Sequence, residues 1–98
     1  VQKMKQELIS KLESEKAGLH KKFKITKLGV FGSYARGDEK TDSDIDILIE
    51  FENTPGMREF FGAEEYLEKI LNKKIDLVRE SAIRPELKER IMSEVIYI

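Results

Sequence analysis

Hydrophobic residues recur at helical spacing at the start of the chain and gather into short apolar runs further on. The apolar positions of the first segment are separated by lysine and glutamate: Met4, Leu8, Leu12 and Leu19. This spacing predicts an amphipathic helix over residues 2–17, with Gly18 near its C-terminus. Residues 25–31 form an apolar run that stops at Gly32, which predicts a first strand.

Two aspartates interrupt the next apolar run. Residues 33–36 are expected to start a short helix, residues 37–43 a polar loop, and residues 44–51 a second strand that contains Asp44 and Asp46. Aspartate is depleted from strands and is costly to bury without a partner. Since successive strand side chains point to opposite faces, these two carboxylates share one face, roughly 6.5–7 Å apart at Cα. The opposite face is apolar: Ile45, Ile47, Ile49 and Phe51.

The second half of the chain continues the alternation of helix and strand. After a turn at residues 55–56, apolar spacings of three and four predict a helix over 57–71. Residues 74–78 predict a third strand, residues 84–94 a last helix, and residues 95–98 a short edge strand. This order predicts an α/β (α+β) domain in which a small mixed sheet of three or four strands is flanked by helices.

Composition narrows the class of protein. The 98 residues suit one small domain over 1–98, and 40% apolar with 38% charged residues suit a soluble protein. There is no cysteine, no signal peptide and no apolar run of membrane-spanning length, so a cytoplasmic location is expected. A formal net charge of −1 gives no overall excess of positive charge of the kind that favours binding to nucleic acid. Residues 37–54, however, carry seven acids against Lys40 alone, a field that favours cations.

A third carboxylate and a glycine–serine pair add candidate chemistry. Asp76 interrupts the third strand as Asp44 and Asp46 interrupt the second. If these strands are neighbours, the three like charges favour a divalent cation such as Mg²⁺. Gly32-Ser33 can present backbone and hydroxyl donors to phosphate. Together these parts suit a two-metal phosphoryl or nucleotidyl transfer site.

Each of these features also has a purely structural interpretation. Asp44 and Asp46 can be solvated carboxylates at a loop-to-strand junction, and Asp76 an ordinary aspartate of an edge strand. Gly32-Ser33 can be a simple N-cap after a strand.

The motifs resemble those of a known family. Gly32-Ser33, ten residues, then Asp44-Ile45-Asp46 resembles the G-S-x10-D-x-D signature of the DNA polymerase β-type nucleotidyltransferase superfamily. With the Pro55-Gly56 turn and the strand around Asp76, residues 25–98 resemble its small branch, the minimal nucleotidyltransferases (MNT). The resemblance implies that Asp44, Asp46 and Asp76 ligate Mg²⁺, two ions, and that Gly32 and Ser33 hold the nucleotide phosphates.

One basic residue of the signature has two interpretations. Arg36 resembles a recurrent arginine of the family and is a candidate for binding the nucleotide. It can equally form a structural ion pair with a nearby acid such as Asp42 or Asp44.

The resemblance also implies a partner and a reaction. Members of this branch are commonly antitoxins of helical HEPN toxins, in type VII toxin–antitoxin systems, and can transfer AMP from ATP to a tyrosine of the toxin. Larger superfamily members carry a further domain that selects base and acceptor, so a partner or a second copy is expected to complete the site. Two alternatives stay open: a non-catalytic antitoxin that acts by binding, and nucleotidyl transfer to a small molecule or an RNA end.

Overall fold

A four-stranded mixed sheet organises the chain in the computed structural model, which describes residues 2–98, with side chains from residue 4 onward. The strand order is β3-β2-β1-β4. The central strand β1 (Ile25–Phe31) pairs antiparallel with both β2 (Ile45–Phe51) and β4 (Ile96–Tyr97). β2 pairs in parallel with β3 (Ile75–Arg79), which therefore forms one edge of the sheet. The predicted fold class is confirmed.

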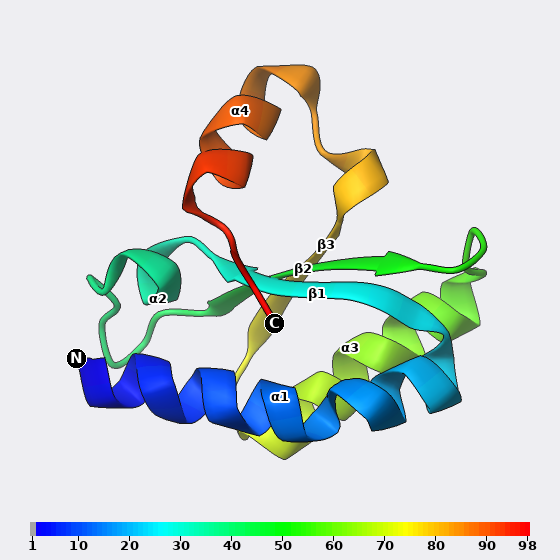
Figure 1. The fold of residues 1–98 in the computed structure, drawn as a ribbon, viewed down its shortest axis with the longest axis horizontal. Coiled ribbons are helices and arrows are strands. Elements are labelled where there is room, and N and C mark those ends of the chain that lie inside the picture. The colour runs from blue at the N-terminus through cyan, green and yellow to red at the C-terminus, as the bar shows by residue number, and fades with distance from the viewer. Residues whose placement is uncertain (1) are drawn as a thin grey trace.

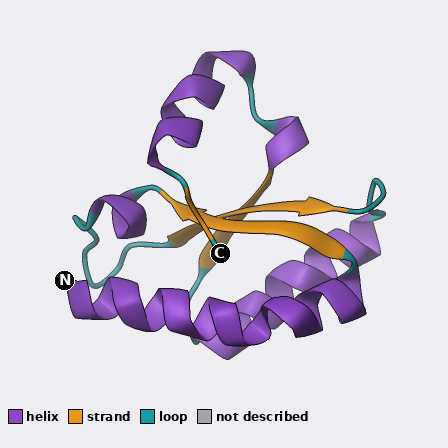
Figure 2. Ribbon diagram, viewed as in Figure 1, coloured by secondary structure: helices purple, strands orange, loops and turns teal. Residues whose placement is uncertain are grey.

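Helices lie on both faces of this sheet. α1 (Gln2–Phe23) and α3 (Met57–Leu71) cover one face, and the one-turn α2 (Ser33–Arg36) follows β1 directly (Figure 1). A 3₁₀ turn, η1 (Glu80–Ala82), and α4 (Pro85–Glu94) stand over the other face (Figure 2). Within residues 2–98, no helix has both the length and the apolar character needed to cross a bilayer.

The main core lies between α1, α3 and the sheet. As the alternation predicts, β2 turns one set of side chains into this core, with exposures of 7% or less: Ile45, Ile47, Ile49 and Phe51. The middle of β2 is buried on its other face as well, because Leu48 has no exposed surface. On that second face Asp46 and Glu50 flank Leu48, so polar groups lie at both ends of a short apolar centre.

The first helix is longer than the sequence pattern predicts. Its predicted end at residue 17 is wrong, because α1 runs to Phe23 and Gly18 is an exposed position inside it. Leu19 is 1% exposed, and Phe23 packs on Tyr66 of α3 with ring centroids 5.5 Å apart, so tertiary contacts continue the helix past the glycine. The helix ends where Lys24 adopts a left-handed conformation with φ 62°.

Candidate functional site

Two of the predicted aspartates lie opposite each other on neighbouring strands. The parallel register pairs Asp46 of β2 with Asp76 of β3, and directly paired residues point to the same face of a sheet. Asp46 is half-buried and Asp76 is exposed. Asp44 is exposed and lies one residue before β2 begins, rather than within the strand. All three carboxylates therefore gather at the same end of β2 and β3.

The Asp46 carboxyl group has a strongly perturbed environment. Its pKa is raised from 3.8 to about 6, chiefly by burial and then by the negative charges of Asp76 and Asp44, against a smaller lowering by Arg36. The ionised form of Asp46 is thus disfavoured by desolvation and by like charges. A bound cation would relieve both effects.

The donor chemistry of this cluster fits Mg²⁺, although the protein does not supply a complete cage. The nearby ligands are carboxylate oxygens, which hard divalent cations prefer. Within the part of the chain that the structure describes, no three histidine, cysteine, aspartate or glutamate side chains are arranged to hold an ion together. Mg²⁺ is usually bound by one or two carboxylates together with water and substrate phosphates, so an incomplete set is compatible with it.

Gly32 brings the backbone directly against Asp46. It follows β1, whose last residue Phe31 pairs with Asp46, and it has φ +75°. A Cβ atom at this position would overlap the Asp46 carboxylate. Glycine is therefore required here both by the backbone conformation and by the close approach. Ser33, the first residue of α2, is partly exposed beside it.

Arg36 and the backbone of Gly32 share a carboxylate from the far end of the chain (Glu94). The Gly32 N–H donates to Oε2 of Glu94 at 2.7 Å, and the Arg36 guanidinium donates to the same oxygen at 3.1 Å. Arg36 also pairs with Asp38 at 3.2 Å. An acid pair of Arg36 was one of the two expectations, but its partners are Asp38 and Glu94 instead of Asp42 or Asp44.

The sequence pattern did not point to Glu94, which is 62 residues from Gly32. One local signal was present. Glu94 is the last residue of α4, and the last turn of that helix carries no basic residue. A carboxylate at a helix C-terminus is unfavourable to the helix dipole, so a glutamate there points to a tertiary partner.

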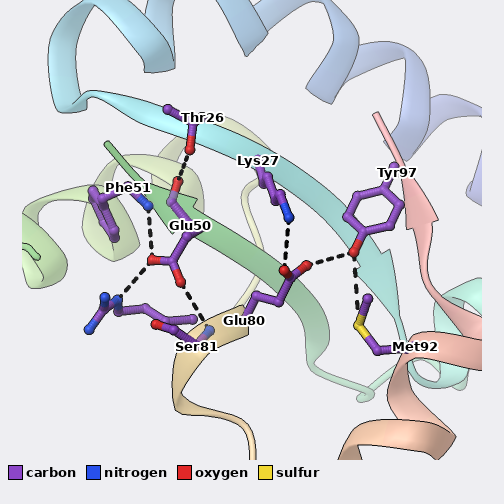
Figure 3. A network of polar contacts seen from close by, with 9 residues as sticks. Thr26, Lys27, Glu50, Phe51, Glu80, Ser81, Met92 and Tyr97 are labelled. Carbon is purple, nitrogen blue, oxygen red and sulfur yellow. Dashed lines mark hydrogen bonds and ion pairs between the residues drawn. The ribbon is translucent and has the colours of Figure 1, made fainter. Parts of the chain in front are cut away.

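A polar network anchors the segments on either side of α4 (Figure 3). Glu50 of β2 accepts hydrogen bonds from the backbone N–H of Phe51 and Ser81 at 3.0 and 2.9 Å, and from Arg79 at 3.2 Å. Burial alone would raise the pKa of Glu50, but the bonds from Ser81, Phe51 and Arg79 lower it to about 2. Glu50 thus ties η1 to β2.

A second carboxylate ties the C-terminal strand to the same network. Glu80 of η1 accepts from Lys27 of β1 at 2.8 Å and from the Tyr97 hydroxyl of β4 at 2.7 Å (Figure 3). Burial and the Glu80 charge raise the pKa of Tyr97 to about 12, so this hydroxyl remains a donor at neutral pH. The two ends of the segment that contains α4 are consequently held on the sheet.

Comparison with known proteins shows one family over most of the chain. The family model for the nucleotidyltransferase domain matches residues 8–98. The chain is 41% identical over 93 residues to the protein adenylyltransferase MntA of Thermococcus cleftensis, which covers 95% of this chain and 94% of that protein.

Solved structures show the same fold. One described as a minimal nucleotidyltransferase superposes with a TM-score of 0.80 and 30% identity, over 94% of this chain and 93% of that chain. A Shewanella oneidensis complex of a tri-AMPylated HEPN toxin with an MNT antitoxin contains a chain that matches with a TM-score of 0.60 and 19% identity, over 99% of this chain and 71% of that chain.

Proposed function

The chain belongs to the nucleotidyltransferase domain family and is a nucleotidyltransferase; from this premise we propose that it transfers AMP from ATP to a protein hydroxyl group. The observation that carries the proposal is the pairing of Asp46 with Asp76 across β2 and β3, with the backbone of Gly32 against Asp46. The relative from Thermococcus cleftensis is named a protein adenylyltransferase, which supports adenylyl as the group transferred.

We propose that Asp44, Asp46 and Asp76 hold Mg²⁺, as two ions when substrate is present. Bound Mg²⁺ would neutralise phosphate charge and favour ionisation of an attacking hydroxyl group. The raised pKa of Asp46 supports this assignment, because burial and then the neighbouring carboxylates of Asp76 and Asp44 disfavour its negative charge, which a bound cation would offset.

Beyond holding Mg²⁺, residues of the chain have two roles in the proposed reaction. The Gly32 N–H and the Ser33 hydroxyl donate hydrogen bonds to phosphate oxygens and hold the nucleotide beside Asp46. The acceptor hydroxyl oxygen attacks the α-phosphorus, and the bond from that phosphorus to the leaving pyrophosphate breaks. We propose that the carboxylate of Asp76, which is exposed at the sheet edge, accepts the hydroxyl proton as the base.

The acceptor that we propose is a tyrosine of a HEPN-type partner, for which the chain acts as the antitoxin. We further propose that residues 1–98 work as one domain and that the protein acts in the cytoplasm. The Shewanella oneidensis complex of a tri-AMPylated HEPN toxin with an MNT antitoxin supports this partner class, because a chain of that complex has the same fold. Arg36 is proposed to contact the nucleotide once it is released from its acid partners.

The direct test is the intact mass of a HEPN-type partner protein after incubation with the chain and Mg-ATP. We expect a mass increase of one or more AMP groups, on tyrosine, and its loss with Asp46→Asn or Asp76→Asn. Asp42→Asn, which removes an exposed loop carboxylate, is the matched control and should retain transfer.

The same experiment distinguishes a non-catalytic antitoxin from an enzyme. If wild type and Asp46→Asn neutralise the partner equally well and neither adds mass, the chain acts by complex formation and the adenylyl transfer proposal fails. Full transfer by Asp46→Asn would refute the residue assignment alone.

A further inference from the structure

A carboxylate of the protein itself, that of Glu94, accepts hydrogen bonds from the groups that the proposed function assigns to nucleotide phosphate. Oε2 of Glu94 accepts from the Gly32 N–H at 2.7 Å and from Arg36 at 3.1 Å, and Oε1 is 3.3 Å from the same guanidinium nitrogen. We propose that Glu94 is a displaceable internal ligand. In the nucleotide-free enzyme it accepts the hydrogen bonds of the Gly32 N–H and Arg36, and it leaves these two donors when ATP binds. This inference rests on the proposed function, since that function assigns Gly32 to phosphate.

The contact of Glu94 with Gly32 and Arg36 has the features of an anion-binding site rather than those of a solvent-exposed ion pair. The Glu94 side chain is 17% exposed, whereas Arg36 is 40% exposed. One oxygen receives a backbone N–H and a guanidinium together, the donor combination that binds phosphate oxygens in proteins. The Gly32 N–H has a single proton to donate, so Glu94 and a phosphate oxygen cannot both receive this bond at full strength.

The helix that carries Glu94 can move at little cost in packing. No residue of α4 is buried, and only Ile91, Met92 and Glu94 of this helix are partly covered. η1 before it and β4 after it are held by Glu50 and Glu80 (Figure 3). α4 is therefore held mainly by the segments before and after it. The hydrogen bonds of Glu94 with Gly32 and Arg36 are a main contact between this helix and the rest of the protein.

Charge favours the same exchange. Glu94 adds a carboxylate to a region that already contains Asp44, Asp46 and Asp76, all of which oppose the approach of a polyanion. When Glu94 leaves, Arg36 loses one acid partner and becomes available to the incoming phosphate. A triphosphate thus replaces one negative group on these donors by another that carries more charge and more acceptor oxygens.

The alternative role for Glu94 predicts the opposite sign. If Glu94 were a positioning residue that holds the Gly32 turn ready for substrate, removing its charge would weaken nucleotide binding. If Glu94 competes with phosphate, Glu94→Gln keeps a neutral acceptor but weakens the competing contact. The difference between charged and neutral hydrogen bonds corresponds to about three- to tenfold tighter nucleotide binding.

The test is calorimetric titration of the full chain with the ATP analogue AMP-PNP and Mg²⁺, and separately with inorganic tripolyphosphate in EDTA. Glu94→Gln should bind both probes about three- to tenfold more tightly than wild type. Glu89→Gln, an exposed charge on the same helix, should bind as wild type does. Hydrogen exchange of the α4 amides should speed up when wild type binds AMP-PNP and should already be fast in free Glu94→Gln.

The outcomes separate this inference from the proposed function. Nucleotide binding by wild type with equal or weaker binding by Glu94→Gln overturns the displaceable-ligand inference and leaves the transferase proposal standing. Binding of AMP-PNP by none of the proteins overturns both. If Glu94→Gln does not fold, Glu94→Asp withdraws the carboxylate by one methylene while keeping its charge, and unchanged or weaker binding by that variant overturns the inference equally.

Discussion

Replacing Asp46 by asparagine removes a charge that the metal-free fold disfavours. The Asp46 carboxyl is half-buried and faces Asp76 across the strand pair. Its pKa in the folded protein is raised, so the protonated form stabilises the fold relative to the ionised form. That contribution is complete below about pH 3.8 and is lost as the pH rises through about 6. At neutral pH the ionised Asp46 therefore destabilises the metal-free protein, and asparagine relieves that cost.

The size of the effect follows from the shift. A rise from 3.8 to about 6 corresponds to about 3 kcal/mol, at about 1.4 kcal/mol per pKa unit. Asp46 keeps some contact with water, which screens its interactions, so we expect about 1–2 kcal/mol of added stability for Asp46→Asn at pH 8. In a domain of this size that corresponds to a rise in Tm of about 5–10 °C.

The assay is urea unfolding of wild type and Asp46→Asn in EDTA at pH 8 and at pH 4. The advantage of the variant should be clear at pH 8 and should shrink as the pH falls from about 6 to 4. Asp42→Asn removes the same charge at an exposed loop position and should change stability by less than about 0.5 kcal/mol at either pH. An Asp46→Asn protein that is no more stable at pH 8, or whose advantage is the same at pH 4, would refute the reasoning.

Three further substitutions probe the framework of the site. Gly32→Ala should destabilise by more than about 1 kcal/mol, because its φ is +75° and the new Cβ meets Asp46; a thermal unfolding curve that matches wild type would contradict this. Gly18→Ala should raise stability by about 0.5–1 kcal/mol in the same assay, because Gly18 is an open, exposed helix position, and a loss of stability would count against the long α1. Glu50→Gln should cost about 2 kcal/mol in urea unfolding at pH 7, while Glu52→Gln, two residues on and exposed, should cost almost nothing. Because the pKa of Glu50 is lowered, its contribution to folding stability is present above about pH 4.5 and is lost as the pH falls towards 2. A wild-type free energy of unfolding that does not change over this pH range would contradict the assignment.

Local patterns were sufficient for the order of the elements. Strand alternation and helical spacing depend only on neighbours two to four residues apart, so β1, β2, α3, β3 and α4 are found within about one residue of their predicted bounds. The same local rule failed for α1, because Gly18 signals an end that buried Leu19 and packed Phe23 override. Propensity is a weak preference that tertiary contacts can exceed.

The sequence by itself indicated that Asp46 and Asp76 interrupt apolar runs, that Asp44 lies two residues before Asp46, and that Gly32-Ser33 follows the first strand. Only the tertiary structure decided that β3 lies parallel beside β2, which sets Asp76 opposite Asp46, and that α4 returns Glu94 to the Gly32 N–H. The reason is range: a residue type and its spacing report on the backbone around it, whereas a contact between residues 32 and 94 exists only once the sheet and α4 have assembled. The candidate chemistry of the site could therefore be predicted from the sequence, whereas the hydrogen bond from the Gly32 N–H to Glu94 could not.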